Sequence, residues 1–387
     1  MASIAGKKSG LVWAVHLSVF VLVVLWLLPT TGLFISSFRT ADQIAASGWW
    51  SALFPQEQNL VLRAAAPSTQ KQEGNLFVIE GNLLAENGNV ADTAISAWGT
   101  SSRAIGEYAP GDTADMGEDG RVTVQENGDY RLENDAEFTG SRGERLFVTA
   151  TVPPKFTLDN YYTVLFSGST TDSMAKAFFN TLTVTIPATV IPILIAAFAA
   201  YALAWMEFPG RALLIAAVVA LLVVPLQLAL IPLLRLHLAI GIGKGYLGVW
   251  LAHTGFGLPL AIYLLRNYMV GLPRDIIECA KVDGATDFQI FTRIILPLSF
   301  PALASFAIFQ FLWTWNDLLV AKVFLIDATG ETTVMTNQIV ELLGTRGGNW
   351  EILATAAFVS IAVPLLVFFA LRRYLVRGLL AGSVKGG

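Results

Sequence analysis

Six long stretches of this chain contain no aspartate, glutamate, lysine or arginine. A helix needs about 20 mostly apolar residues to cross a bilayer, and a charged side chain at its middle costs roughly 2.5–3.5 kcal/mol on insertion scales. The charge-free windows therefore predict an all-α polytopic membrane protein with six transmembrane helices. The windows are Leu11–Phe38, Ala177–Met206, Ala212–Leu234, Gly245–Leu265, Ile294–Asn316 and Ile352–Leu371.

The composition of the chain supports the same class. Hydrophobic residues make up 54% and charged residues only 14%, whereas a soluble globular protein carries about 25% charged residues. This excludes a soluble enzyme, a disordered chain and a nucleic-acid binder, and the net charge of −4 attracts no phosphate backbone. The single cysteine, Cys279, excludes a disulfide framework and a cysteine-based zinc site.

An acidic block separates the first window from the second. Residues 39–176 hold ten basic and nineteen acidic residues, while the rest of the chain is apolar and mildly basic. Arg121–Val124 alternates, an Asn-Gly turn follows, and Tyr130–Leu132 resumes the pattern, which is typical of a β-hairpin. We therefore expect a small β-rich domain at about 70–152, inserted between the first and second helices. Further strands are expected at Leu76–Ile79 and Arg145–Val152, and an amphipathic interfacial helix within Phe156–Phe166.

Basic residues in the short loops predict the orientation. With the N-terminus in the cytoplasm, eleven lysines and arginines lie on that side and four lie in the short outer loops. Both termini are then cytoplasmic and the insert lies outside. The first window is too long for a signal peptide and ends without a clean cleavage site, so we interpret it as a span. The expected regions are 1–38 (N-terminus and first helix), 39–170 (insert), 171–372 (membrane core) and 373–387 (cytoplasmic tail).

The segment between the fourth and fifth windows carries the most informative motif. It is Glu278-Cys279-Ala280-x-x-Asp283-Gly284-Ala285, followed by Ile294-x-Leu296-Pro297, within residues 271–297. Its pattern predicts a helix that begins near Pro273, a bend at Gly284 and a second helix. The bend would need glycine either for a positive φ or because another backbone approaches too closely for a side chain. On physical grounds alone, an ordinary amphipathic connector explains the segment equally well.

This motif resembles the EAA loop of the type-1 (MetI-like) permeases of bacterial ABC importers. The only departure is Cys279, which stands where that family usually has alanine and is similarly small. Asn180-Thr-Leu, Trp315-Asn316-Asp317 and the tail Gly378–Gly386 resemble the smaller subunit of the maltose-type sugar permeases. The large insert after the first span is more like the α-glucoside branch of that group.

The resemblance implies a mechanism for the chain and a set of partners. In this family the EAA loop is a coupling helix that docks on a separate ATPase dimer, which binds ATP and Mg²⁺, so this non-catalytic chain holds no cofactor itself. Implied partners are a second permease, a periplasmic or lipid-anchored sugar-binding protein, the sugar and membrane lipid, in a bacterial inner membrane, with no nucleic acid. Glu278 and Asp283 would position the loop, Cys279 and Ala280 would allow docking, and Gly284 would make the bend. The tail residues Ser383, Val384 and Lys385 would reach the ATPase interface.

Two further candidate sites keep an alternative interpretation. Arg346, Asn349 and Trp350, in the outer loop before the last window, could enter the binding protein's cleft and help expel sugar, or could form a surface turn. In the fifth window, Gln310, Thr314 and Asp317 share one helical face. With Trp313 they could line a sugar path, or they could be inter-helix hydrogen-bonding groups beside belt aromatics.

Two other function classes fit the sequence less well. An ion-coupled secondary transporter would need ionisable groups near the middle of the bilayer, and the six windows contain no acidic residue, lysine or arginine. A membrane-anchored sensor would need a cytoplasmic signalling domain, and no inner segment is long enough. The chain has no GxxxxGK[ST] motif to hold ATP phosphates.

Overall fold

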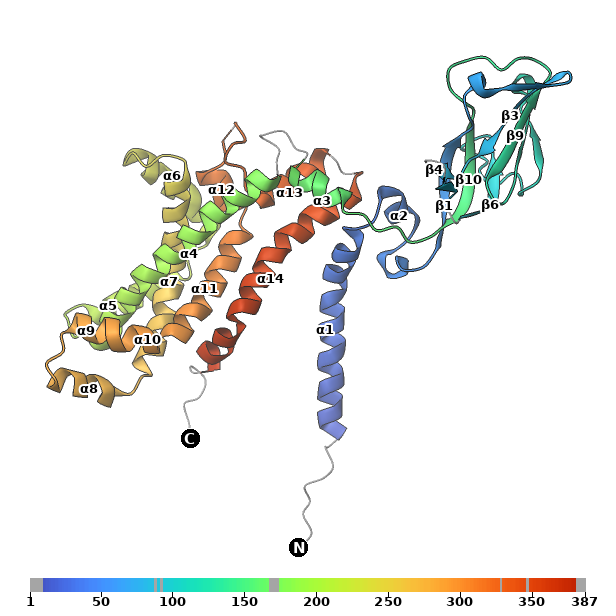
Figure 1. The fold of residues 1–387 in the computed structure, drawn as a ribbon. Coiled ribbons are helices and arrows are strands. Elements are labelled where there is room, and N and C mark those ends of the chain that lie inside the picture. Colours follow the sequence, from blue (N-terminus) through green and yellow to red (C-terminus); the bar gives the residue numbers. More distant parts are fainter. Residues whose placement is uncertain are drawn as a thin grey trace, which may run out of the picture. The chain divides into compact units, whose positions relative to one another are not determined.

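The structure, a computed structural model, describes residues 10–86, 89–90, 93–166, 174–327, 329–345 and 348–380. It separates into two compact units (Figure 1). The first contains Met1–Asn160 and Asn349–Thr355, and the second contains Tyr161–Gly348 and Ala356–Gly387. Two helices, α3 (Asp159–Phe166) and α14 (Trp350–Leu380), contain residues of both units.

The first unit begins with helix α1 (Gly10–Ser36), which is apolar on all sides and exposed along nearly its whole length. A helix with no polar face is typical of a segment surrounded by lipid. A short helix, α2 (Ala41–Ala46), follows and begins with a capping box between Thr40 and Gln43. The end of α1 is tied to later parts of the same unit. The carbonyl oxygen of Ser37 accepts hydrogen bonds from Asn160 Nδ2 at 3.0 Å and Thr355 Oγ1 at 3.1 Å.

The remainder of the first unit is a β-domain, as the hairpin signals predicted. A three-stranded sheet has the order β1-β10-β6 and a five-stranded sheet the order β2-β3-β9-β8-β7, all antiparallel, with a separate pair β4-β5. The strands are β1 (Gln56–Arg63), β2 (Lys71–Glu73), β3 (Leu76–Asn82), β4 (Ala85–Glu86), β5 (Asn89–Val90), β6 (Ala94–Gly99), β7 (Thr113–Asp115), β8 (Arg121–Val124), β9 (Asp129–Asn134) and β10 (Arg145–Val152). Three 3₁₀ turns accompany them: η1 (Trp49–Ser51), η2 (Pro67–Thr69) and η3 (Gly117–Asp119).

One hydrophobic core joins the two larger sheets. Trp98 and Leu146 from the smaller sheet pack in the same cluster as Ile79, Val122 and Leu132 from the larger one. Each of these side chains is almost completely buried, and in β8, β9 and β10 buried residues alternate with more exposed ones, which is typical of a sheet with one covered face.

The β-domain begins earlier in the chain than expected. β1 starts at Gln56, whereas the sequence pattern placed the β-rich core at about 70–152. The sequence Gln-Glu-Gln-Asn at its start carries little strand propensity. β1 exists because its residues pair with the whole length of β10, from Gln56 opposite Val152 to Arg63 opposite Arg145.

The second unit is a helical bundle, in which α4 packs along α7 and against α11 (Figure 1). Two hydrophobic clusters fill it, and both include residues of α4 and α7. Its helices are α4 (Met174–Trp205), α5 (Arg211–Leu221), α6 (Leu226–Ala239), α7 (Tyr246–Val270), α8 (Arg274–Val282), α9 (Asp287–Ile290), α10 (Leu296–Leu298), α11 (Phe300–Trp315), α12 (Leu319–Phe324) and α13 (Met335–Thr345), with a π-helical turn η4 (Phe291–Ile295).

Four of the predicted windows are single helices long and apolar enough to cross a membrane: α1, α4, α7 and the first part of α14. The other two windows are bent pairs of helices. α5 and α6 meet at 110°, and the segment Asp287–Leu298 meets α11 at 69°. The described part of the chain therefore contains four single spans, or six if each bent pair is one span. Proline explains the first break, because Pro225 lacks an N–H group and disfavours a helical Val224 before it.

Candidate functional site

The motif segment 271–297 folds as a helix, a tight turn and a second helix. The turn at the end of α8 is a Schellman motif, in which the amide of Ala285 donates to the carbonyl of Ala280 at 3.0 Å. Within the loop that this hydrogen bond closes, the amide of Gly284 donates to the carbonyl of Lys281, also at 3.0 Å. This nested pair requires a left-handed residue at the position of Gly284, and its φ is +78°.

The structure distinguishes the two possible reasons for glycine at this bend. A Cβ atom built on Gly284 meets no described atom within 4 Å. Close approach of another backbone in this chain therefore does not explain the residue, and the positive φ does. The second helix then begins with a capping box, because Thr286 Oγ1 accepts from the amide of Gln289 and Gln289 Oε1 accepts from the amide of Thr286.

One face of this segment is anchored on the bundle. Ile277 of α8 and Ile290 of α9 are buried in a cluster with Leu265 of α7 and Phe306 of α11. Ala280 and Ala285 are half-buried against the same cluster. Their small side chains thus let α8 lie close to the chain's own helices, whereas the sequence assigned Ala280 to docking. The segment is therefore held to α7 and α11 through packed side chains, as a rigid attachment requires.

The opposite face of the segment is open. Glu278, Cys279 and Asp283 are exposed on it. Large apolar side chains of the segment are also exposed, above all Val282 at 87% and Phe288 at 64%. The sequence interpretation missed this pair, although an apolar residue among the polar positions of an amphipathic helix was a readable signal. An exposed apolar pair rimmed by charges is typical of a contact surface.

The last part of the motif leads from α9 into the membrane helix α11. Ile294 and Leu296 are half-buried, and Leu296 packs against the same cluster as Ile277. Pro297 is exposed within α10. The π-helical turn η4 covers residues 291–295, where Phe291 and Ile295 face the core. These residues join the segment mechanically to α11.

The structure places some of the residues proposed for a sugar path inside the bundle and others on its surface. Gln310 is 1% exposed, and its Nε2 donates to the carbonyl oxygens of Ala188 on α4 at 3.0 Å and His253 on α7 at 3.5 Å. A Cβ on Gly257 would lie 2.6 Å from Gln310 Oε1, so this glycine makes room for the amide. Gln310 therefore joins three helices of one bundle. Trp313 is exposed on another face of α11.

Thr314 and Asp317 face inward with Gln310. Thr314 is buried, and the Asp317 carboxylate accepts hydrogen bonds from the amides of Val320 at 3.3 Å and Ala321 at 3.1 Å, which caps α12. Asp317 Oδ2 also lies 3.7 Å from Nε2 of the buried His253. Sequence reasoning missed this histidine, because isolated histidines carry no spacing pattern and the partner lies more than 60 residues away along the chain.

Together these groups form a buried polar seam between α4, α7 and α11. Within the described part of the chain, several of its polar atoms have no hydrogen-bond partner: Thr185 Oγ1, Thr189 Oγ1, both His253 ring nitrogens, Thr254 Oγ1, Gln310 Oε1 and Thr314 Oγ1. Buried polar atoms without partners are costly. The seam thus has unused hydrogen-bonding capacity inside the bundle.

Asn180 has a positioning role that the motif alone did not show. Its Nδ2 donates to the carbonyl oxygens of Glu331 and Thr333, each at 2.9 Å, and its Oδ1 accepts from the hydroxyl of Tyr246 at 2.8 Å. The neighbouring Thr181 Oγ1 accepts from the amide of Met335 at 2.9 Å. The start of α4 therefore holds the loop before α13. This contact lies at the opposite end of the bundle from α8 (Figure 1).

The remaining expected residues are less informative. Asn349 and Trp350 are exposed at the start of α14. Arg346, Ser383, Val384 and Lys385 lie outside the described residues. Among the residues that the structure describes, no group of three or more His, Cys, Asp or Glu side chains could hold a metal ion.

The β-domain has an open groove of about 550 Å³ on its five-stranded sheet, with Arg131 among the residues that line it. Arg131 at its centre pairs with three carboxylates, those of Glu73, Glu80 and Glu133. These hydrogen bonds, with Glu133 the largest contribution, raise the pKa of the Arg131 guanidinium. The positive charge is therefore balanced within the domain.

Comparison with known proteins matches the second unit to one family. The family described as "Binding-protein-dependent transport system inner membrane component" matches residues 163–380. The alpha-glucoside transport system permease protein AglG of Rhizobium meliloti is 61% identical over 386 residues, which cover 98% of this chain and 99% of that protein. The osmoprotective compounds uptake permease protein GgtD of Synechocystis sp. is 59% identical over 231 residues, covering 60% of this chain and 76% of that protein.

Among solved structures, a bacterial ABC transporter involved in the import of the acidic polysaccharide alginate aligns with a TM-score of 0.48 and 21% identity. The alignment covers 58% of this chain and 81% of that chain. The family match and the near-complete alignment with the Rhizobium meliloti protein confirm the resemblance drawn from the EAA motif. The chain is an integral membrane permease and not an enzyme, and it belongs to the family of binding-protein-dependent transport system inner membrane components, the MetI-like permeases of bacterial ABC importers.

Proposed function

We propose that this chain is one of two permease subunits in an ATP-driven importer of oligosaccharides, with α-glucosides such as maltose, sucrose or trehalose as substrates. A separate ATPase dimer binds ATP and Mg²⁺, and a sugar-binding protein delivers the sugar from the outer side. The substrate class is supported by the name and the 61% identity of the Rhizobium meliloti relative, which spans nearly the whole chain.

The observation that carries the coupling proposal is the two-faced segment 271–297. Its inner face is packed on α7 and α11 through Ile277 and Ile290. Its outer face exposes Val282 and Phe288 beside Glu278 and Asp283. A segment that is rigidly attached on one side and apolar on the other can transmit motion from a docked partner to the membrane helices. The docked partner is the ATPase, and the tail residues 383–385 contribute to the same interface.

The sugar path is formed together with the second permease. Gln310 and Thr314 are packed inside the bundle of this one chain. They therefore do not by themselves line a sugar path through this chain. Trp313 is exposed on the surface of α11 and can face the second permease. On the outer side, residues 346–350 contact the binding protein. The insert modulates how that protein docks.

Docking on the ATPase can be tested at the apolar pair. Val282→Ala and Phe288→Ala remove apolar area that docking would bury, which is worth roughly 1–2 kcal/mol for each side chain. The affinity of the solubilised permease pair for the ATPase should then fall about tenfold per substitution. Val61→Ala is the matched control, because Val61 is also an exposed valine, at 60%, but lies in the β-domain. Unchanged ATPase affinity in both α8–α9 variants would contradict the docking proposal.

One observation favours a second candidate, an ion-coupled transporter. His253 and Asp317 place an ionisable pair inside the bundle, 3.7 Å apart, and buried pairs of this kind are used by proton-driven carriers. Uptake of labelled maltose by proteoliposomes that contain the whole complex separates the two. We expect uptake that needs internal ATP and persists with an uncoupler. Uptake driven by a proton gradient without ATP would establish the second candidate instead.

Orientation is a further part of the proposal. Both termini and the segment 271–297 are cytoplasmic, and the insert is periplasmic. A reporter that is active only in the cytoplasm, fused after Gly120 of η3–β8, should be silent, whereas one fused after Gly284 should be active. The reverse pattern would show that the termini and segment 271–297 are periplasmic and that the insert is cytoplasmic.

A further inference from the structure

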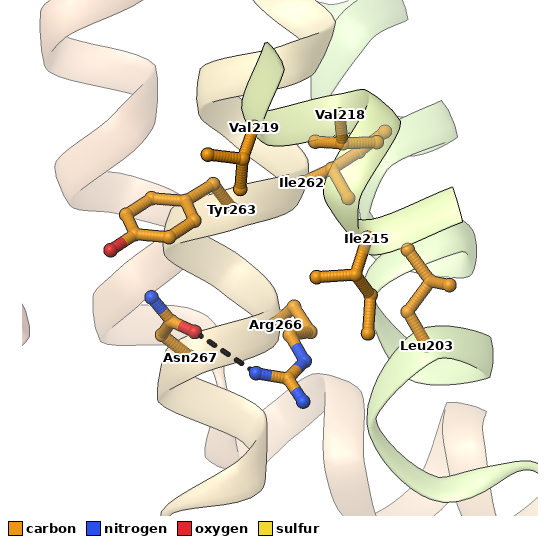
Figure 2. Close-up of a pocket in the computed structure, with 8 residues that line it drawn as sticks. All are labelled: Leu203, Ile215, Val218, Val219, Ile262, Tyr263, Arg266 and Asn267. Atoms are coloured by element: carbon orange, nitrogen blue, oxygen red, sulfur yellow. Dashed lines mark hydrogen bonds between the residues drawn. The ribbon is translucent and has the colours of Figure 1, made fainter. Parts of the chain in front are cut away.

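A small hollow lies between α4, α5 and α7 (Figure 2). It has a volume of about 30 Å³, and its walls are almost entirely apolar. Two polar side chains, Arg266 and Asn267, close one end. The lining residues are Leu203, Ile215, Val218, Val219, Ile262, Tyr263, Arg266 and Asn267.

The depth of the hollow can be read from its helices. Leu203 lies two residues before the end of α4, Ile215 lies one turn after the start of α5, and Arg266 lies one turn before the end of α7. At 1.5 Å per residue, these positions are about 3–6 Å inside the helix ends. All three ends lie where the chain leaves the membrane bundle, next to segment 271–297. This is the depth at which an arginine with its stem in the apolar layer reaches lipid headgroups.

The charge of Arg266 is not balanced within the described part of the chain. Its Nε is buried and has no hydrogen-bond partner there, and its Nη1 donates to Asn267 Oδ1 at 3.3 Å (Figure 2). None of the ion pairs formed by the described residues includes it. A buried guanidinium nitrogen without a partner is costly, so an anion that accepts from Nε would stabilise this end of the hollow.

The surroundings indicate which anion. The face of α5 around the hollow is apolar and exposed, and it includes Leu214 and Val219. Residues 208–239, which contain all of α5 and α6, include no acidic residue, so no carboxylate of either helix can reach Arg266. An apolar wall that continues into a cationic end fits a molecule with an acyl chain and a phosphate. Basic pockets between membrane helices on the cytoplasmic side bind such headgroups.

We propose that this hollow, the Arg266 site, binds an anionic phospholipid from the leaflet beside segment 271–297. The phosphate lies on the Arg266 guanidinium, and the first methylenes of an acyl chain lie against Val219 and Ile262. This assignment rests on the proposed function only in treating the bundle as a membrane domain, and it is independent of which solute the complex transports. Because α7 runs directly into segment 271–297, the lipid stabilises the end of the helix to which that segment is attached.

The test uses the full chain in detergent and titrates phosphatidylglycerol and phosphatidylcholine with identical acyl chains, with binding followed by native mass spectrometry. One arginine near the surface contributes about 1 kcal/mol, so Arg266→Gln should reduce the preference for phosphatidylglycerol about fivefold. Arg266→Lys should retain most of it. Val219→Trp keeps the charge but fills the apolar wall, and it should weaken the binding of both lipids. Arg235→Gln is the control, because Arg235 is an exposed arginine on α6 and should leave the preference unchanged.

Four results would overturn the proposal. Retention of the full preference by Arg266→Gln, or an equal loss of it in Arg235→Gln, would show that the site does not select the lipid. Displacement of the lipid by glycerol phosphate at equal concentration would identify a free phosphate site. If Arg266→Gln leaves lipid binding intact but releases the second permease from the solubilised permease pair, a protein carboxylate is the anion. If Arg266→Gln fails to insert, the Val219→Trp titration tests whether lipid occupies the hollow, and wild-type binding of both lipids in this variant would overturn the proposal.

Discussion

Replacing Gly284 with valine tests the coupling proposal at its most demanding backbone position. The left-handed conformation at φ +78° costs an ordinary L-residue roughly 1–2 kcal/mol, and a β-branched side chain lies at the upper end of the 1–3 kcal/mol range for such strain. A Cβ meets no described atom within 4 Å, so the cost is conformational and not a clash. If valine instead leaves this conformation, the turn loses two hydrogen bonds, worth about 0.5–1.5 kcal/mol each. Both routes give roughly 1–3 kcal/mol, which lowers the population of the native turn about 5- to 150-fold.

The assay is ATP hydrolysis and sugar uptake by the reconstituted complex at matched expression. Gly284→Val should still insert, because the membrane helices do not use this turn, but it should lose uptake together with stimulation of ATP hydrolysis by the loaded binding protein. Gly284→Asn is the matched control, since asparagine tolerates the left-handed region, and it should retain most of both activities. Wild-type uptake and stimulation in Gly284→Val would refute the assignment of this turn to coupling. Equal loss in both variants would show that glycine is needed for close contact with a partner instead of for its φ.

Three further predictions follow from other parts of the structure. Gln310→Leu removes the hydrogen bond from α11 to α4 and should lower the free energy of unfolding in detergent by about 0.6–1.7 kcal/mol, whereas Trp313→Leu should change it little; equal effects in thermal melts would contradict the inward assignment of Gln310. A fragment of residues 54–155 should give dispersed amide NMR signals, while one of residues 65–155 should be less stable because it lacks β1; equal melting temperatures would show that β1 is dispensable. Burial raises the pKa of the Tyr130 hydroxyl, which accepts a hydrogen bond from the amide of Ala65, so this group stabilises the β-domain fully below its unfolded pKa of about 10 and loses that contribution as the pH rises further. The stability difference between wild type and Tyr130→Phe should therefore shrink between about pH 9 and pH 11, and a constant difference in melts across this range would contradict the assignment.

The local features of this chain could be predicted because their causes are local. The absence of charge over whole windows predicts membrane helices irrespective of their neighbours. Four single helices long and apolar enough to cross a membrane lie at predicted windows, namely α1, α4, α7 and α14. The strand pattern at Arg121–Val124 and Arg145–Val152 matched β8 and β10 residue for residue, since alternation and turn residues act within a few positions. Gly284 likewise followed from the need for a bend between two helical patterns, and the motif around it was sufficient to identify the family.

The three-dimensional structure decided what depends on contacts between distant residues. β1 is a strand because β10 pairs with it, and its own first residues carry little strand propensity. The inward position of Gln310, its bonds to Ala188 and His253, and the approach of His253 to Asp317 are set by the packing of α4, α7 and α11. The unpaired Nε of Arg266 is equally a property of the packed bundle. Sequence patterns reveal which side chains are polar, whereas burial and pairing depend on which helix lies opposite, and that is determined only when the whole bundle has folded.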